Sequence, residues 1–130
     1  MNKIKGVHHI CIKPNKEIYG KTVDFYTQVL GCSLIRSWGE VDSAGCMLDC
    51  GDGTIMEIIT GPDDGTVNTG SLQHIAFKVE DVESFIEDVR KAGYKITMEP
   101  NSIVIGTDYP VQIAFFEGPV GETIEFFKEL

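Results

Sequence analysis

The sequence predicts an α+β fold made of two tandem βαβββ modules. Two nearly identical strand-like segments, VHHICIK from Val7 and LQHIAFKV from Leu72, are each followed by an amphipathic helical stretch and then by further strand-like runs. A stretch rich in Gly and Asp separates the two copies. We therefore expect one domain over residues 1–130, with modules at about 5–60 and 72–130 and a linker at 61–71.

In the first module, the strand at Val7–Lys13 precedes a predicted helix at Lys21–Leu30, and Gly31 suits the end of that helix. A Gly-Asp-Gly sequence then predicts a tight hairpin turn. The three strands expected after the helix are Cys32–Trp38, Gly45–Cys50 and Thr54–Thr60.

In the second module, Asp81 is the expected N-cap of a helix that Gly93 ends, and apolar residues recur on one face between them. A Thr-Asp-Tyr-Pro turn and a Gly-Pro-Val-Gly turn divide the rest of the chain. The expected strand-like runs are Tyr94–Met98, Ser102–Ile105, Val111–Phe116 and Glu122–Lys128.

Charge and composition exclude several classes of function. Eleven basic residues against twenty acidic ones give a net charge of −9, which repels nucleic-acid phosphates and anionic membranes. The N-terminus has no apolar signal-like region, and no apolar run reaches membrane-spanning length. We expect a cytoplasmic protein that acts on a small molecule, with its four cysteines reduced.

Side chains alternate between the two faces of a strand, so the position of each polar residue indicates which face it occupies. His9 lies on the face opposite Ile10 and Ile12, and His74 likewise lies opposite the apolar face of its strand. Glu57 and Glu125 occupy nearly matching places in the two modules. If the apolar faces cover the helices, a curved mixed sheet would present these four residues on its concave side.

Two imidazoles and two carboxylates are a ligand set suited to divalent Ni, Co, Zn, Mn or Fe. Two adjacent open positions on such an ion could bind two neighbouring oxygens of one substrate. A structural role for each histidine remains an alternative, as does neutralisation of the carboxylates by Lys13 and Lys78, which would leave a metal-free cavity. A slip of one residue in the first strand would exchange His8 for His9.

The chain resembles the vicinal oxygen chelate superfamily, which includes glyoxalase I, methylmalonyl-CoA epimerase, extradiol dioxygenases and bleomycin resistance proteins. The likeness spans nearly the whole chain, and FYTQVLG, at Phe25 to Gly31, is its most specific phrase. The motifs that carry it are HHICIK, DFYTQVLGCSLIR, MEI, HIAFKVED and GPVGETIEFF.

By position in these motifs, the metal ligands of bacterial glyoxalase I match His9, Glu57, His74 and Glu125. The resemblance implies one divalent ion, with Ni or Co preferred, and a lyase or isomerase that removes a proton next to a metal-bound carbonyl. Glu125 would be the general base and Glu57 the second candidate. The resemblance also implies a homodimer.

Three further residues are candidates for substrate binding: Lys13, Cys11 and Trp38. The chain departs from the glyoxalase I pattern at two places where such enzymes hold glutathione. Lys13 stands where Arg is usual, and Gly61 stands where Asn is usual. Lysine keeps the charge of arginine but not its bidentate fork.

Two rival functions are also compatible with the sequence. An epimerase or an Fe(II) extradiol dioxygenase could use the same scaffold. A non-catalytic protein that binds an antibiotic or a metabolite could do so as well, and such a protein would lack a complete ligand set.

Overall fold

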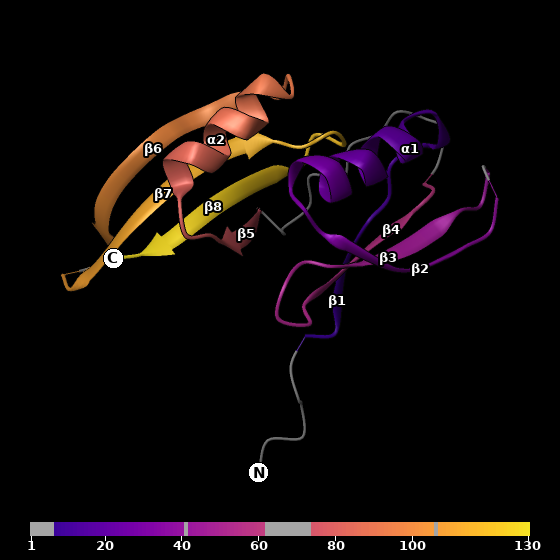
Figure 1. Ribbon diagram of the computed structural model, residues 1–130, viewed down its shortest axis with the longest axis horizontal. Helices are drawn as coiled ribbons and strands as arrows, with labels where there is room; N and C mark the ends of the chain where they lie inside the picture. The colour runs from indigo at the N-terminus through magenta and orange to yellow at the C-terminus, as the bar shows by residue number, and fades with distance from the viewer. Residues whose placement is uncertain (1–6, 41, 62–73, 106) are drawn as a thin grey trace, which may run out of the picture. The chain divides into compact units, whose positions relative to one another are not determined.

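A computed structural model describes residues 7–40, 42–61, 74–105 and 107–130 (Figure 1). The chain divides into two compact units, Met1–Thr66 and Val67–Leu130. Each unit contains one βαβββ module, so the predicted α+β class and the repeated order of elements are confirmed. The expected linker at 61–71 lies outside the described residues, apart from Gly61.

The first unit has a four-stranded mixed sheet of its own, in the order β1-β4-β3-β2. Strand β1 runs parallel to β4, and the other two pairings are antiparallel. Its elements are β1 (His9–Ile12), α1 (Lys16–Asp24), the π-helical turn η1 (Phe25–Val29), β2 (Ser33–Trp38), β3 (Gly45–Asp49) and β4 (Ile55–Ile59).

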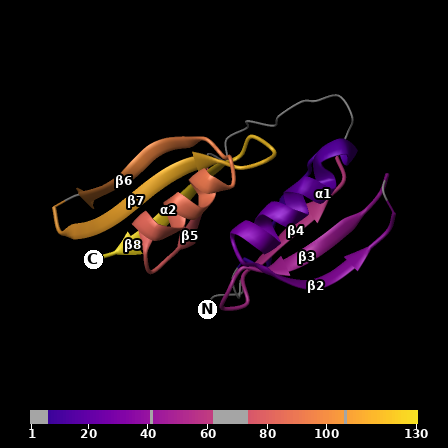
Figure 2. The ribbon, with the colours of Figure 1, turned by 45° about the horizontal axis from the view of Figure 1, so that its top comes forward.

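The second unit repeats this topology with the sheet order β5-β8-β7-β6, and β5 is parallel to β8 (Figure 2). Both sheets therefore place the first strand of a module beside its last strand. The elements are β5 (Ile75–Lys78), α2 (Val82–Lys91), β6 (Ile96–Ile105), β7 (Tyr109–Glu117) and β8 (Thr123–Glu129).

The first helix begins earlier than predicted, at Lys16 rather than Lys21. Asn15 is its N-cap, because the side-chain oxygen of Asn15 accepts a hydrogen bond from the backbone N–H of Ile18. The π-helical turn continues it, and Gly31 follows with a φ of 81°, a conformation that favours glycine. The capping asparagine was the sequence signal for the true start.

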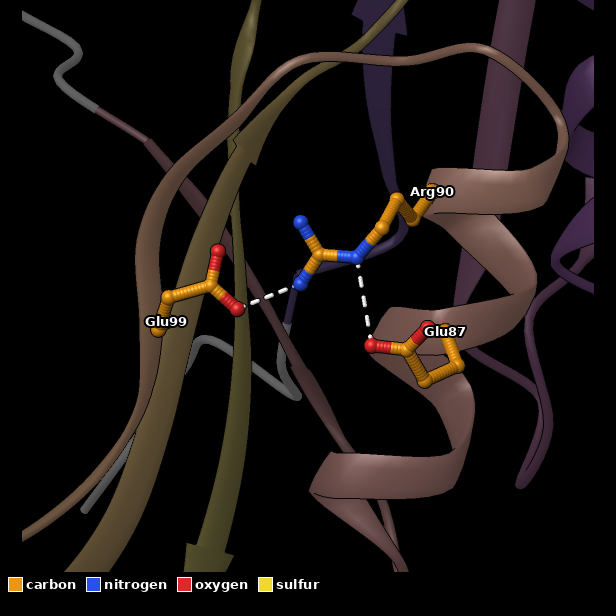
Figure 3. Close-up of polar contacts among 3 residues, drawn as sticks. All are labelled: Glu87, Arg90 and Glu99. Atoms are coloured by element: carbon orange, nitrogen blue, oxygen red, sulfur yellow. Dashed lines mark hydrogen bonds and ion pairs between the residues drawn. The ribbon is translucent and has the colours of Figure 1, made fainter.

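The second helix begins and ends where the sequence predicts. Asp81 accepts a hydrogen bond from the N–H of Ser84. Near the other end, Arg90 contacts both Glu87 and Glu99, which ties the helix to strand β6 (Figure 3). These three side chains are exposed, so salt screens the ion pairs and they stabilise the fold only weakly.

Two of the expected strands, Tyr94–Met98 and Ser102–Ile105, form the single long strand β6. Pro100 lies between the two expected strands and cannot donate a backbone hydrogen bond. Strand β6 is at the edge of its sheet, where such a donor is not needed. The pairing of β6 with β7 is irregular, with register shifts on either side of Met98.

Each helix covers one face of its own sheet. Helix α1 packs on β4, and α2 lies across β6, β7 and β8. Burying each large apolar side chain in these layers contributes roughly 1.5–3 kcal/mol. No helix in the described ranges is long and apolar enough to span a membrane. The largest fully buried residues include Phe25, Tyr26, Leu48, Met56, Ile58, Ile86, Phe116, Ile124 and Phe126.

Candidate metal centre

In the first unit, the parallel pairing of β1 and β4 brings a histidine and a glutamate together. Glu57 lies directly opposite Cys11, and His9 is two residues before Cys11 and therefore on the same face. The Nε2 atom of His9 is 3.5 Å from Oε1 of Glu57. The helix covers the other face of the sheet, where Met56 and Ile58 are buried.

The second unit builds the same pair in the same register. Glu125 lies directly opposite Ala76, and His74 precedes Ala76 by two residues. The Nε2 atom of His74 is 3.1 Å from Oε1 of Glu125. The sequence places His74 with Glu125 and His9 with Glu57, and the structure forms both pairs.

Both carboxylates are largely buried, whereas both imidazoles are partly open to solvent. The side-chain exposure is 14% for Glu57 and 9% for Glu125. Burial raises the pKa of Glu125, although the neighbouring His74 acts in the opposite direction. A carboxylate in this setting is stabilised by a bound cation or by a protonated imidazole.

Each imidazole ring also contacts a second neighbouring side chain. Nδ1 of His9 is 2.9 Å from Nδ1 of His8, so a hydrogen bond there leaves Nε2 of His9 directed at Glu57. The ring of His74 meets Phe115 edge to face, with the ring centres 5.6 Å apart. It is therefore His9, and not the neighbouring His8, that contacts Glu57.

Within each unit, the distance between the histidine and the glutamate suits two neighbouring ligands of a metal ion. With metal–ligand bonds of about 2.1 Å, two neighbouring ligand atoms are about 3.0 Å apart in octahedral geometry and about 3.4 Å apart in tetrahedral geometry. The observed separations are 3.1 and 3.5 Å. Across the described residues, no three or more His, Cys, Asp or Glu side chains gather as a metal-binding group, so each unit offers a pair of donors.

The Cys11 side chain lies beside Glu57 on the face that carries the histidines. Its thiol is a hydrogen-bond partner of Glu57. Burial and the nearby carboxylate raise its pKa to about 11, so Cys11 is protonated at neutral pH. It serves here as a hydrogen-bond donor and not as a nucleophile.

Trp38 and Lys13, the other two candidates for substrate binding, lie at the same end of the first sheet but at its two opposite edges. Trp38 on β2 is paired with Gly45, and its indole ring lies against that glycine, where a Cβ atom would collide with it. Lys13 follows the end of β1, and its backbone lies against Gly61. The two positions that depart from the glyoxalase I pattern are thus direct neighbours.

Two residues on this face or next to it make contacts that sequence reasoning did not predict. Arg36 pairs with Met47, which pairs with Glu57, so all three share one face of the sheet. A register shift between Leu34 and Arg36 hides this from simple alternation. The other is His8, whose contact with the first ligand candidate was signalled only by the adjacency of the two histidines.

A comparison with known protein families identifies the superfamily of this chain. The model of the glyoxalase/bleomycin resistance protein/dioxygenase superfamily matches residues 7–126. The chain belongs to this superfamily, which is also called vicinal oxygen chelate. Its repeated βαβββ modules are those that the superfamily resemblance implied.

Two curated relatives are both named as lactoylglutathione lyases. A probable lactoylglutathione lyase from Vibrio cholerae is 31% identical over 114 residues, covering 83% of this chain and 80% of that protein. A lactoylglutathione lyase from Neisseria meningitidis is 30% identical, covering 84% of this chain and 81% of its own length.

Solved structures of the superfamily agree in fold. A glyoxalase family protein from Enterococcus faecalis superposes with a TM-score of 0.72 at 25% identity, covering 95% of this chain and 97% of its own. An antibiotic-binding protein from Streptomyces, TnmS3, has a TM-score of 0.76 at 19% identity and covers 100% of both chains. These two proteins and this chain therefore share a fold.

Proposed function

We propose that this chain is a metal-dependent lyase or isomerase of the glyoxalase I type, acting on a small molecule with two adjacent oxygens. The repeated histidine–glutamate pair is the observation that carries the proposal. Relatives about 30% identical to this chain are named lactoylglutathione lyases, and they support the choice of reaction.

In this proposal His9, Glu57, His74 and Glu125 together bind one divalent ion, with Ni or Co preferred and Zn, Mn or Fe as further candidates. Each pair alone would supply half of the donor set. The two pairs come either from one chain or from two chains of a homodimer. When bound, the ion supplies a positive charge that stabilises the negative charge developing on the substrate oxygens.

The proton is moved by the protein. Glu125 is the proposed general base: its carboxylate accepts the proton from the carbon next to the substrate carbonyl and returns it to the neighbouring carbon. Phe115 lies directly opposite Glu125 on β7 and shares its face, and the Glu125 side chain is only 9% exposed, which limits access of water to that carboxylate. Glu57 is the second candidate, and both histidines remain ligands throughout.

Substrate binding is assigned to the open part of the same face of the first unit. Cys11 donates a hydrogen bond to Glu57 and orients that carboxylate. Trp38 offers a flat apolar surface, and Lys13 offers a positive charge near the end of β1. Lys13 lacks the bidentate fork of the arginine that is usual at this position. Adducts of several thiols are therefore to be assayed as substrates, with the glutathione adduct as one of them.

The proposal is tested by measuring bound metal and turnover on one preparation. The full chain is loaded with Ni, Co or Zn and assayed with the hemithioacetal of methylglyoxal and glutathione, and with other thiol adducts. Glu125→Gln should lower kcat by roughly 10²–10⁴-fold, as expected for loss of a general base. Glu129→Gln, an exposed position on the same strand, is the matched control and should keep full activity.

Two results would count against the proposal. Undiminished turnover by Glu125→Gln would remove the assigned base. Failure of the metal-free chain to take up Ni, Co or Zn would favour a non-catalytic binding protein.

A further inference from the structure

Two cysteines outside the candidate metal centre face each other across the first sheet. Cys32 immediately precedes β2, and Cys50 immediately follows β3. These strands are antiparallel, with Ser33 opposite Asp49, so the next pair outward is Cys32 with Cys50. Each thiol shifts the pKa of the other, so the two side chains are close neighbours.

The backbone around this pair has the geometry in which a bridge can form. The N–H of Cys32 donates to the carbonyl of Tyr26 at 2.9 Å, and the N–H of Cys50 donates to the carbonyl of Thr54 at 2.8 Å. Neither cysteine donates to the other, which is the pattern of a non-hydrogen-bonded antiparallel pair. Such pairs have Cα atoms about 4.5 Å apart, within the range of about 4.4–6.8 Å that disulfides span.

We propose that Cys32 and Cys50 form a redox-sensitive dithiol that a low-molecular-weight disulfide converts reversibly into an intramolecular bond. This site is separate from the proposed lyase function and does not depend on it. The other two cysteines are placed differently. Cys46 is buried in β3 as a hydrogen-bond partner of Tyr19, and Cys11 lies beside Glu57 on β1.

The exchange has a defined order. Cys50 is the attacking group, because Cys50 is half-buried whereas Cys32 is buried, so the oxidant reaches Cys50 more easily. The Cys50 thiolate attacks one sulfur of the oxidant and releases the first small thiol. Cys32 then loses its proton to solvent, attacks the sulfur of Cys50 and releases the second. Two protein thiols are oxidised, and one small disulfide is reduced to two thiols.

The Cys32–Cys50 disulfide would restrain β2, the most exposed strand of the first unit. Strand β2 is at the edge of the sheet, pairs only with β3, and is exposed at all six of its residues. A covalent link at Cys32, just before the strand, limits local opening of β2 and restricts the unfolded chain. The oxidised form should therefore melt at a higher temperature and exchange its β2 amide hydrogens more slowly.

The test uses the full chain in a metal chelator, incubated with excess 2-hydroxyethyl disulfide and then freed of reagent. The intact mass should fall by two hydrogen atoms, and the titratable thiols should fall from four to two. Dithiothreitol should restore both values. Trypsin should release residues 22–36 covalently linked to residues 37–78, which hold Cys46 as well as Cys50.

Cysteine variants identify the partner and keep the test decisive. Cys46→Ala must retain the link, whereas Cys50→Ala must lose it. The melting temperature of each variant under reducing conditions reports whether it has folded. A link that survives in Cys50→Ala, a link between two chains, or a stable mixed disulfide with a gain in mass would overturn the proposal. So would an oxidised wild-type chain whose β2 amides exchange as fast as before.

Discussion

His74 and Glu125 are held 3.1 Å apart by two parallel strands, and His9 and Glu57 repeat that relationship. In both units the glutamate lies opposite the residue two positions after the histidine. A parallel pair of strands fixes this offset through its hydrogen bonds, so the pairing does not depend on long loops. The duplication thus preserves a pair of donors as well as a fold.

If the His9–Glu57 and His74–Glu125 pairs have equal roles in binding one metal ion, loss of either histidine should lower the metal affinity by a similar factor. His9→Ala and His74→Ala should each lower the affinity for Ni or Co by at least about tenfold, since even loss of an outer-shell partner has an effect of that size. Competition with a chromophoric chelator measures the affinity, and elemental analysis should give one ion per chain. Two ions per chain, or a variant that loses only half of its metal, would mean that the pairs act separately.

The sequence predicts the pairs because duplication and strand alternation are local patterns. His9 and His74 repeat within the same motif, and the register that places Glu57 and Glu125 beside them follows from a first strand pairing with a last one. Other features depend on tertiary context. The bulge beside Arg36, the continuous strand through Pro100 and the facing of Cys32 with Cys50 require the strand pairings themselves.

Helix boundaries show a different limit of sequence reasoning. Apolar periodicity identifies the buried face of the first helical segment at Phe25 and Tyr26, which the structure places in η1 and also buries. The first turns of α1 have little apolar periodicity and contain Gly20. Periodicity alone therefore does not reveal that the helix starts at Lys16, whereas the Asn15 cap does. Capping residues deserve equal weight with periodicity when a glycine weakens the pattern.

The contact between His8 and His9 predicts a positioning role for His8. Replacing His8 with Ala removes the hydrogen bond to Nδ1 of His9, and metal affinity should fall by about 10–100-fold while the metal stoichiometry stays the same. His8→Asn retains a hydrogen-bonding group and should recover part of the loss. If His8→Ala binds metal as tightly as wild type, the contact has no orienting effect.

The buried carboxyl group of Glu125 predicts a pH-dependent effect in the metal-free protein. Its folded-state pKa is raised above the ordinary 4.5, so folding favours the protonated form. The stability that this group contributes is present below the unfolded pKa and is lost as pH rises through the folded pKa. In chelator, Glu125→Gln should therefore gain melting temperature relative to wild type between about pH 4 and pH 7. A wild-type chain that gains on the variant over this range would contradict the assignment.

The closeness of Trp38 to Gly45 predicts a measurable change in the single tryptophan of the chain. A Cβ atom in Gly45→Ala would overlap the indole ring, and because the ring is 40% exposed it can rotate away from the sheet. We expect red-shifted tryptophan emission and a destabilisation of about 1–3 kcal/mol, typical of overpacking.

Gly20→Ala is the matched control for that substitution. No atom lies within 4 Å of the added Cβ, and Gly20 is inside a helix. The variant should gain about 0.5–1 kcal/mol without a change in emission. If Trp38 lines the substrate site, Gly45→Ala should also raise KM with little change in kcat, whereas Gly20→Ala should leave both unchanged. An unaltered emission spectrum in Gly45→Ala would show that the ring does not rest on this glycine, and the substrate role of Trp38 would lose its structural support.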